Sequence, residues 1–83
     1  MKAYPKLRGA LSERDITSAD LASMLGRSQS YVSERMMAKR YFWDLREIYT
    51  ILNIIGVSYD RIFEFFPPNG GIVEPKKRGE KVV

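Results

Sequence analysis

The fold of this chain is decided by the stretch Leu21-Ala22-Ser23-Met24-Leu25-Gly26-Arg27-Ser28-Gln29-Ser30-Tyr31-Val32-Ser33. Its apolar residues recur at the spacing of a helix face, first before Gly26 and again after Ser28. Glycine adopts the left-handed backbone conformation that ends many helices, and a serine side chain can accept a hydrogen bond at the start of the next helix. The stretch therefore predicts two short helices, residues 18–25 and 29–37, that meet at a glycine turn.

Capping residues indicate where two of the helices begin. Thr17 precedes the first short helix, and Asp20 three residues later completes the reciprocal pair of hydrogen bonds called a capping box. Asp44 and Glu47 repeat this spacing and predict a longer helix that ends at Gly56. We expect the buried stripe of this longer helix to consist of Leu45, Ile48, Ile51, Leu52 and Ile55.

Two further helices complete the predicted domain. Residues 4–14 carry an amphipathic pattern with Pro5 in the first turn, where proline is tolerated. A fifth helix takes Ser58 as its cap and ends before two prolines. A helix turns by about 200 degrees over two residues, so its phenylalanines cannot all face one small core. We therefore divide the chain into a helical domain, residues 1–67, and a basic tail, residues 68–83.

The residues around the glycine turn resemble those of the phage repressor and Cro family of helix-turn-helix proteins, and the resemblance covers most of residues 7–66. The matching residues are Thr17, Leu21, Ala22, Leu25, Gly26, Ser28 and Val32. The resemblance implies an all-α, compact five-helix, lambda-repressor-like domain with a flexible C-terminal tail. It also implies a transcriptional regulator of a phage, prophage or bacterium that binds a double-stranded DNA operator as a homodimer.

The second short helix is the element expected to read the bases. If Val32 and Met36 point inward, a rotation of about 100 degrees per residue leaves the opposite face exposed. That outward face consists of Gln29, Ser30, Ser33, Glu34 and Met37. Glutamine can pair with adenine, serine can donate or accept, and glutamate can accept from the cytosine amine. We therefore expect base contacts in the major groove from Gln29, Ser30, Ser33 and Glu34. For Glu34 the alternative is a solvated side chain.

Basic and hydroxyl side chains near this helix are expected to contact phosphate. In the family, two basic residues follow the recognition helix, and Lys39 and Arg40 match them, whereas Met37 and Ala38 replace an Asn and a Gly. Ser18 occupies a family position at which glutamine often binds phosphate. The full expected set is Ser18, Arg27, Ser28, Tyr31, Lys39 and Arg40. Residues 27–46 include five basic and two acidic residues, which predicts a strongly salt-dependent affinity.

Composition narrows the function further. The chain has no Cys and no His, so the usual zinc ligands and the usual nucleophile–base pairs are missing; we expect no metal, no cofactor and no enzymatic activity. Lys and Arg number 14 against 10 Asp and Glu, and the net charge of +4 favours a polyanionic partner. No apolar run is long enough to span a membrane, and the first residues lack a signal-peptide pattern, so we expect a cytoplasmic protein.

Three features leave alternatives open. The aromatic run of residues 41–43 favours a core position for Trp43 and leaves Tyr41 undecided between the core and DNA. The basic residues of the tail either follow the DNA backbone or only aid solubility. The apolar residues of the tail could pair as strands across a dimer. We expect the homodimer to form through the fifth helix or the tail. The same fold could also serve as a protein-interaction module, such as an antirepressor or an antitoxin, and the departure at Met37 favours this alternative.

Overall fold

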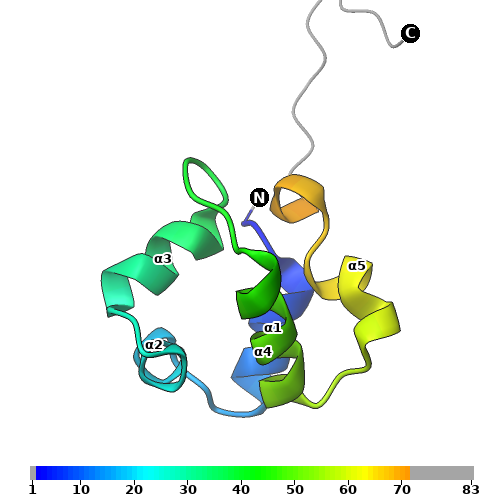
Figure 1. Cartoon of the computed structure of the whole chain (residues 1–83), viewed down its shortest axis with the longest axis horizontal. Helices are drawn as coiled ribbons and strands as arrows, with labels where there is room; N and C mark the ends of the chain where they lie inside the picture. The colour runs from blue at the N-terminus through cyan, green and yellow to red at the C-terminus, as the bar shows by residue number, and fades with distance from the viewer. Residues whose placement is uncertain (1, 72–83) are drawn as a thin grey trace, which may run out of the picture.

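A computed structural model describes residues 2–71 of the chain, and all regular secondary structure within this range is helical, without a β-strand. Figure 1 shows the order of the elements. The α-helices and 3₁₀ helices are α1 (Pro5–Glu13), α2 (Ser18–Leu25), α3 (Gln29–Met37), α4 (Leu45–Ile55), η1 (Tyr59–Arg61), α5 (Ile62–Phe65) and η2 (Pro68–Gly71). None of the helices in this range is both long enough and apolar enough to cross a membrane.

Local capping chemistry forms α2 and α3 with the bounds that the sequence predicts. At the start of α2, the Asp20 backbone N donates to Thr17 Oγ1 at 3.1 Å, and the Thr17 backbone N donates to Asp20 Oδ2 at 3.0 Å. Gly26 ends α2 with a φ of 69°, in the left-handed region where glycine is favoured. Ser28 then caps α3, because its hydroxyl oxygen accepts from the Tyr31 backbone N at 3.1 Å.

The predicted capping box of α4 is also present, but one residue of its predicted core stripe is wrong. The Glu47 backbone N donates to Asp44 Oδ1 at 2.8 Å, and the Asp44 backbone N donates to Glu47 Oε1 at 3.1 Å. Leu45 is 56% exposed, whereas Glu47 is only 7% exposed. Glu47 lies one turn before the buried Ile51, and Leu45 is rotated from Glu47 by about 200 degrees, so Leu45 points to solvent.

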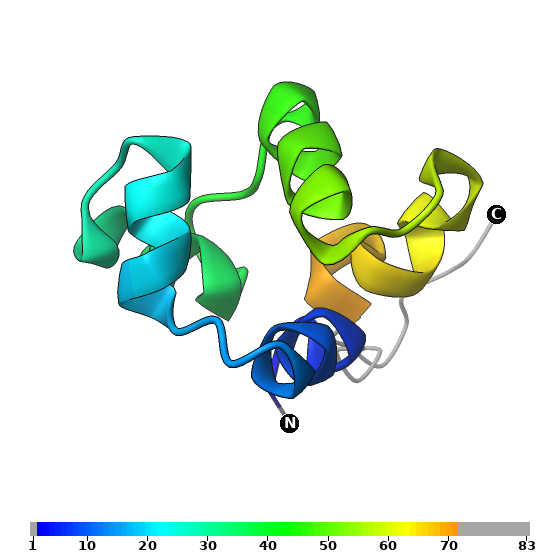
Figure 2. The same ribbon diagram turned by 90° about the horizontal axis from the view of Figure 1, so that it is seen from below.

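The helices pack around α1 and α4, which lie in the middle of the molecule. The pair α2 and α3 lies on one side of them, and α5 with η2 lies on the other, as Figures 1 and 2 both show. The most deeply buried side chains come from four of the helices: Leu7, Leu21, Val32, Ile51, Leu52 and Ile55. Trp43 is buried as predicted, and Tyr41 is exposed. The core thus joins the first four helices into one packed unit.

The predicted fifth helix is replaced by two shorter pieces. A 3₁₀ turn, η1, leads into the single-turn α5, and the Ser58 side chain makes no capping hydrogen bond. Its hydroxyl bonds instead to the carboxylate of Asp60. Phe65 is buried while Phe63 is 73% exposed, which confirms that these rings cannot share one core. A serine at the predicted cap position was therefore not sufficient to predict whether the segment forms an α-helix or a 3₁₀ helix.

The packed part of the chain continues beyond the predicted boundary at residue 67. The η2 turn lies against the N-terminal segment, where the Tyr4 backbone N donates to the Gly70 carbonyl oxygen at 2.7 Å. Gly70 is buried, so residues 68–71 belong to the domain and not to the tail. The predictions for the tail, namely flexibility, DNA contacts from Lys76, Lys77, Arg78 and Lys81, and strand pairing by its apolar residues, lie outside the described residues.

Candidate nucleic-acid interface

The outward face of α3 brings together the four residues that the sequence predicts to contact bases. Gln29, Ser30, Ser33 and Glu34 are all exposed, and Met37 extends the same face by one turn. On the opposite side of α3, Val32 and Met36 are buried in the core. The helix therefore presents a polar, accessible face that is backed by apolar packing.

The first turn of α3 is tied to the first turn of α4 by a side-chain contact. The Tyr31 hydroxyl donates to Oε2 of Glu47, while Oε1 of the same carboxylate accepts from the Asp44 backbone. This hydrogen bond raises the pKa of the Tyr31 hydroxyl, since ionising it would place a second negative charge beside Glu47. Tyr31 was expected to contact phosphate, but its hydroxyl already has a partner within the protein.

Two arginines surround this contact. Nε of Arg27 lies 4.0 Å from Glu47 Oε2, and Nε of Arg35 lies 3.9 Å from Glu47 Oε1. Both guanidinium groups also lie over the Tyr31 ring, with the Arg35 carbon 3.4 Å and the Arg27 carbon 4.8 Å from its centroid. The count of basic and acidic residues over 27–46 did not include Glu47, which is the next residue. Its carboxylate lowers the net positive charge around Arg27 and Arg35.

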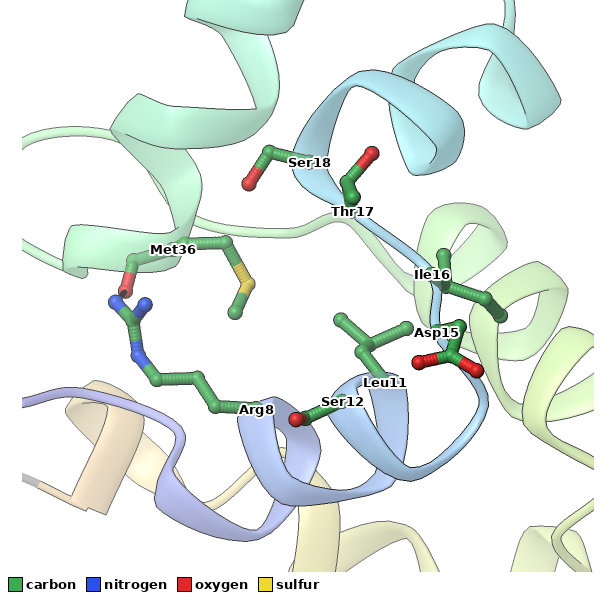
Figure 3. A pocket seen from close by; sticks show the side chains of 8 residues that line it. All are labelled: Arg8, Leu11, Ser12, Asp15, Ile16, Thr17, Ser18 and Met36. Carbon is green, nitrogen blue, oxygen red and sulfur yellow. Dashed lines mark hydrogen bonds between the residues drawn. The ribbon is translucent and has the colours of Figure 1, made fainter.

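Arg8 holds the other end of α3. Its Nη2 donates to the carbonyl oxygen of Met36 at 2.8 Å, and its Nε donates to the carbonyl oxygen of Ala3 at 2.7 Å. Figure 3 shows the guanidinium group against the Met36 carbonyl, at the edge of a hollow between α1, the start of α2 and the end of α3. Carbonyl groups in the last turn of a helix lack partners within the helix, so Arg8 stabilises this end.

The remaining residues expected to contact phosphate lie at three places: the start of α2, the turn before α3 and the segment after α3. Ser18, at the start of α2, lines the hollow of Figure 3 and is exposed. Arg27 and Ser28 are exposed in the turn between α2 and α3, and Lys39 and Arg40 are exposed after α3. Together with the α3 face, these side chains give a surface with basic groups at both ends of the helix.

The turn after α3 contains a left-handed residue, Ala38, at a position where the family that the sequence resembles has a glycine. Ala38 has a φ of 54° and is buried, and the Met37 side chain before it is exposed. A non-glycine residue in this region carries a cost of about 1 to 2 kcal/mol. Packing of Ala38 against the region of Gly70 accompanies this conformation, since a Cβ built on Gly70 would lie 2.9 Å from the Ala38 Cβ.

Sequence reasoning identified the outward residues but missed the contacts that hold α3 in place. Glu47 was assigned only to a capping box, and Arg8 was assigned no role, because each acts on a residue that is distant in sequence. A buried acidic residue in a first helical turn gives no distinctive sequence signal. Among residues 2–71 there is no group of three acidic side chains that could hold a metal ion.

Comparison of the chain with models of protein families, with curated proteins and with solved structures finds no match in any of the three.

Proposed function

We propose that this protein is a sequence-specific double-stranded DNA-binding regulator of the Cro or repressor type, with a lambda-repressor-like helix-turn-helix formed by α2 and α3. In this proposal α3 enters the major groove and reads an operator. The observation that carries the proposal is the exposure of Gln29, Ser30 and Ser33 on one face of a helix whose other face is buried. Burial of these three side chains would have left Glu34 alone among the residues expected to contact base edges.

The charge around α3 supports the same proposal. Arg27, Lys39 and Arg40 are exposed at its two ends, where the sugar-phosphate backbones pass when a helix lies in the groove. Ser18 and Ser28 are also exposed and add hydroxyl groups that can donate to phosphate. Asp20 lies close to Ser18 in the first turn of α2 and weakens the attraction for phosphate there. We therefore assign the main backbone contacts to the three basic residues.

Selection from a duplex library with a randomised centre tests the proposal directly. The wild-type protein should enrich one sequence family, and Gln29→Ala should then lose about 1 to 3 kcal/mol of binding free energy on the enriched duplex through a single base position. Glu13→Gln is the control, because Glu13 is exposed on α1, outside the α3 face. Equal losses on the enriched and on a random duplex would contradict base reading by Gln29.

A protein-interaction module, such as an antirepressor or an antitoxin, is the second candidate. It is favoured by apolar side chains that remain exposed at the rim of the α3 face, among them Met37, Tyr41 and Phe42. Salt distinguishes the two functions. DNA affinity that depends on several phosphate contacts falls by orders of magnitude between about 50 and 200 mM salt, whereas an apolar interface responds little.

We also propose a homodimer, because operators of this kind consist of two half-sites about 34 Å apart. The exposed ring of Phe63 on α5 is the feature that supports an interface through this helix. The helix that carries it, α5, lies on the side of α1 and α4 that is away from α3, so a dimer contact through α5 leaves the outward face of α3 free.

A further inference from the structure

Among residues 2–71, Glu47 is the one charged residue that is buried. Its hydrogen-bond and ion-pair partners come from α3, from the turn before α3 and from the start of α4. A buried carboxylate is costly unless hydrogen bonds and cations compensate it. Here two hydrogen bonds and two guanidinium groups do so. Loss of any one of these partners would leave the buried Glu47 carboxylate less well compensated and would cost free energy. The surrounding side chains are therefore held in one arrangement.

We propose that the contact between Tyr31 and Glu47 sets the orientation of α3 and thereby the sequence specificity of the protein. This inference rests on the proposed function in DNA binding. Glu47 acts as a positioning residue through Tyr31 and touches no base itself. Its side chain also restrains Arg27 and Arg35, which limits their attraction to phosphates of any sequence.

The geometry explains why this contact controls orientation. Tyr31 lies in the first turn of α3, next to Gln29 and Ser30 in sequence and half a turn before Ser33. Its hydroxyl, at the far end of a rigid ring, is held by a carboxylate that the capping box of α4 fixes in turn. Arg8 secures the opposite end of α3 through the Met36 carbonyl. Rotation of α3 about its axis is therefore opposed at both ends.

The second consequence concerns charge. In wild type, Glu47 is within 4.0 Å of both Arg27 and Arg35. Replacing it with glutamine keeps the size and the capping geometry but removes the negative charge. The two arginines then attract any duplex more strongly. Two effects therefore lower the ratio of operator affinity to random-DNA affinity in this variant. The fit to the operator worsens, and the affinity for random DNA rises.

Tyr31→Phe and Glu47→Gln test the proposal against the duplex that wild-type protein enriches from the randomised library and against a random duplex of equal length. Tyr31→Phe should lose about tenfold in affinity for the enriched duplex, the size of one good base contact, and little for the random one. Glu47→Gln should also bind the random duplex more tightly, and its log–log salt dependence should steepen by about 1, which is one added phosphate contact.

Tyr59→Phe is a matched control. The Tyr59 hydroxyl donates to Oδ1 of Asn53 on α4 at 2.9 Å, so this variant also removes a tyrosine hydroxyl bonded to α4, but far from α3. It should leave the ratio of the two affinities unchanged. A purely structural role of Glu47 would lower both affinities together, in proportion to the folded fraction, and an unchanged ratio in Tyr31→Phe and Glu47→Gln would overturn the proposal.

Amide chemical shifts of the DNA-free protein separate this inference from the proposed function. Tyr31→Phe and Glu47→Gln should shift the amides of Gln29, Ser30 and Ser33, and Tyr59→Phe should not. Unmoved amides would refute the positioning role even if the protein binds an operator. Failure of wild-type protein to enrich any sequence would instead refute the proposed function, with the amide shifts still deciding whether Glu47 positions α3.

Discussion

The region of α2 and α3 and the region from Val57 to Gly71 have similar sequence signals, yet only the first folds as its sequence predicts. Both contain a hydroxyl residue at a predicted cap and a turn with glycine, Gly26 in the first and Gly70 with Gly71 in the second. In α2 and α3 each cap makes its hydrogen bond. In the second region Ser58 bonds to Asp60 and makes no capping hydrogen bond, and the chain forms two 3₁₀ turns around a single α-helical turn. Local chemistry therefore decides the first region, and tertiary contacts decide the second.

The glycines of the two regions provide the sharpest test of this difference. Gly70 has a φ of 66°, and a Cβ added to it would lie 2.8 Å from the Ala3 Cβ and 2.9 Å from the Ala38 Cβ. Gly70→Ala should therefore destabilise the protein by about 2 to 5 kcal/mol, since it combines a left-handed alanine with overpacking. Urea unfolding followed by circular dichroism measures the change.

Gly26→Ala is the counterpart in the first region. Gly26 has a similar φ of 69°, but a Cβ added there meets nothing within 4 Å. The expected loss is only the conformational cost, about 1 to 2 kcal/mol. If the two variants lost equal stability, the close packing of η2 on the N-terminal segment would play no part in holding the second region.

The sequence predicted the elements that short-range signals define. The bounds of α2 and α4 followed from their caps and from the glycines at their ends, and the start of α3 followed from its serine cap, because these groups act within a few residues. The placement of Gly70 beneath Ala3 and Ala38 could not be predicted, because it joins segments more than 30 residues apart. Leu45 was misassigned for a related reason, since its apolar side chain fits the periodicity while Glu47 occupies the buried position.

In the candidate site, too, the features set by short-range signals could be predicted and those set by tertiary contacts could not. The outward residues of α3 followed from the rotation of a helix with Val32 and Met36 inside. The contacts of Glu47 with Tyr31 and of Arg8 with Met36 did not, since each depends on how two helices are placed relative to each other. The sequence thus indicates which side chains face outward, and the tertiary structure determines the angle at which they do so.

Removing the predicted caps compares the two regions again, with a smaller effect. Thr17→Ala deletes the hydroxyl that accepts from Asp20 N and should cost about 0.5 to 2 kcal/mol. Ser58→Ala deletes a hydroxyl that caps no backbone group, and its effect should stay within about 0.5 kcal/mol. Thermal and urea unfolding of both variants measure the difference. A loss in Ser58→Ala as large as that in Thr17→Ala would mean that local capping also governs the second region.

The smallest expected effect is a pH dependence that arises in the second region. Arg61 on η1, and then Lys6 on α1, donate to Glu64 and lower the pKa of its carboxyl from 4.5 to about 2. A carboxyl with a lowered pKa in the folded state stabilises the protein above pH 4.5, and this contribution is lost as the pH falls from about 4.5 to about 2. Glu64→Gln should therefore flatten the dependence of the unfolding free energy on pH in this window.

Two further variants separate the local part of that effect from the tertiary part. Arg61→Gln removes a partner three residues away, whereas Lys6→Gln removes the 3.1 Å ion pair that links α5 to α1. The Glu64 side-chain carbon, followed by NMR, should titrate at a higher pH in both variants, and more so in Arg61→Gln, because that guanidinium group is the larger cause of the lowered pKa. A larger shift in Lys6→Gln would mean that the link to α1 dominates. In that case even the charge pairing of this region would be set by tertiary structure, as its backbone is.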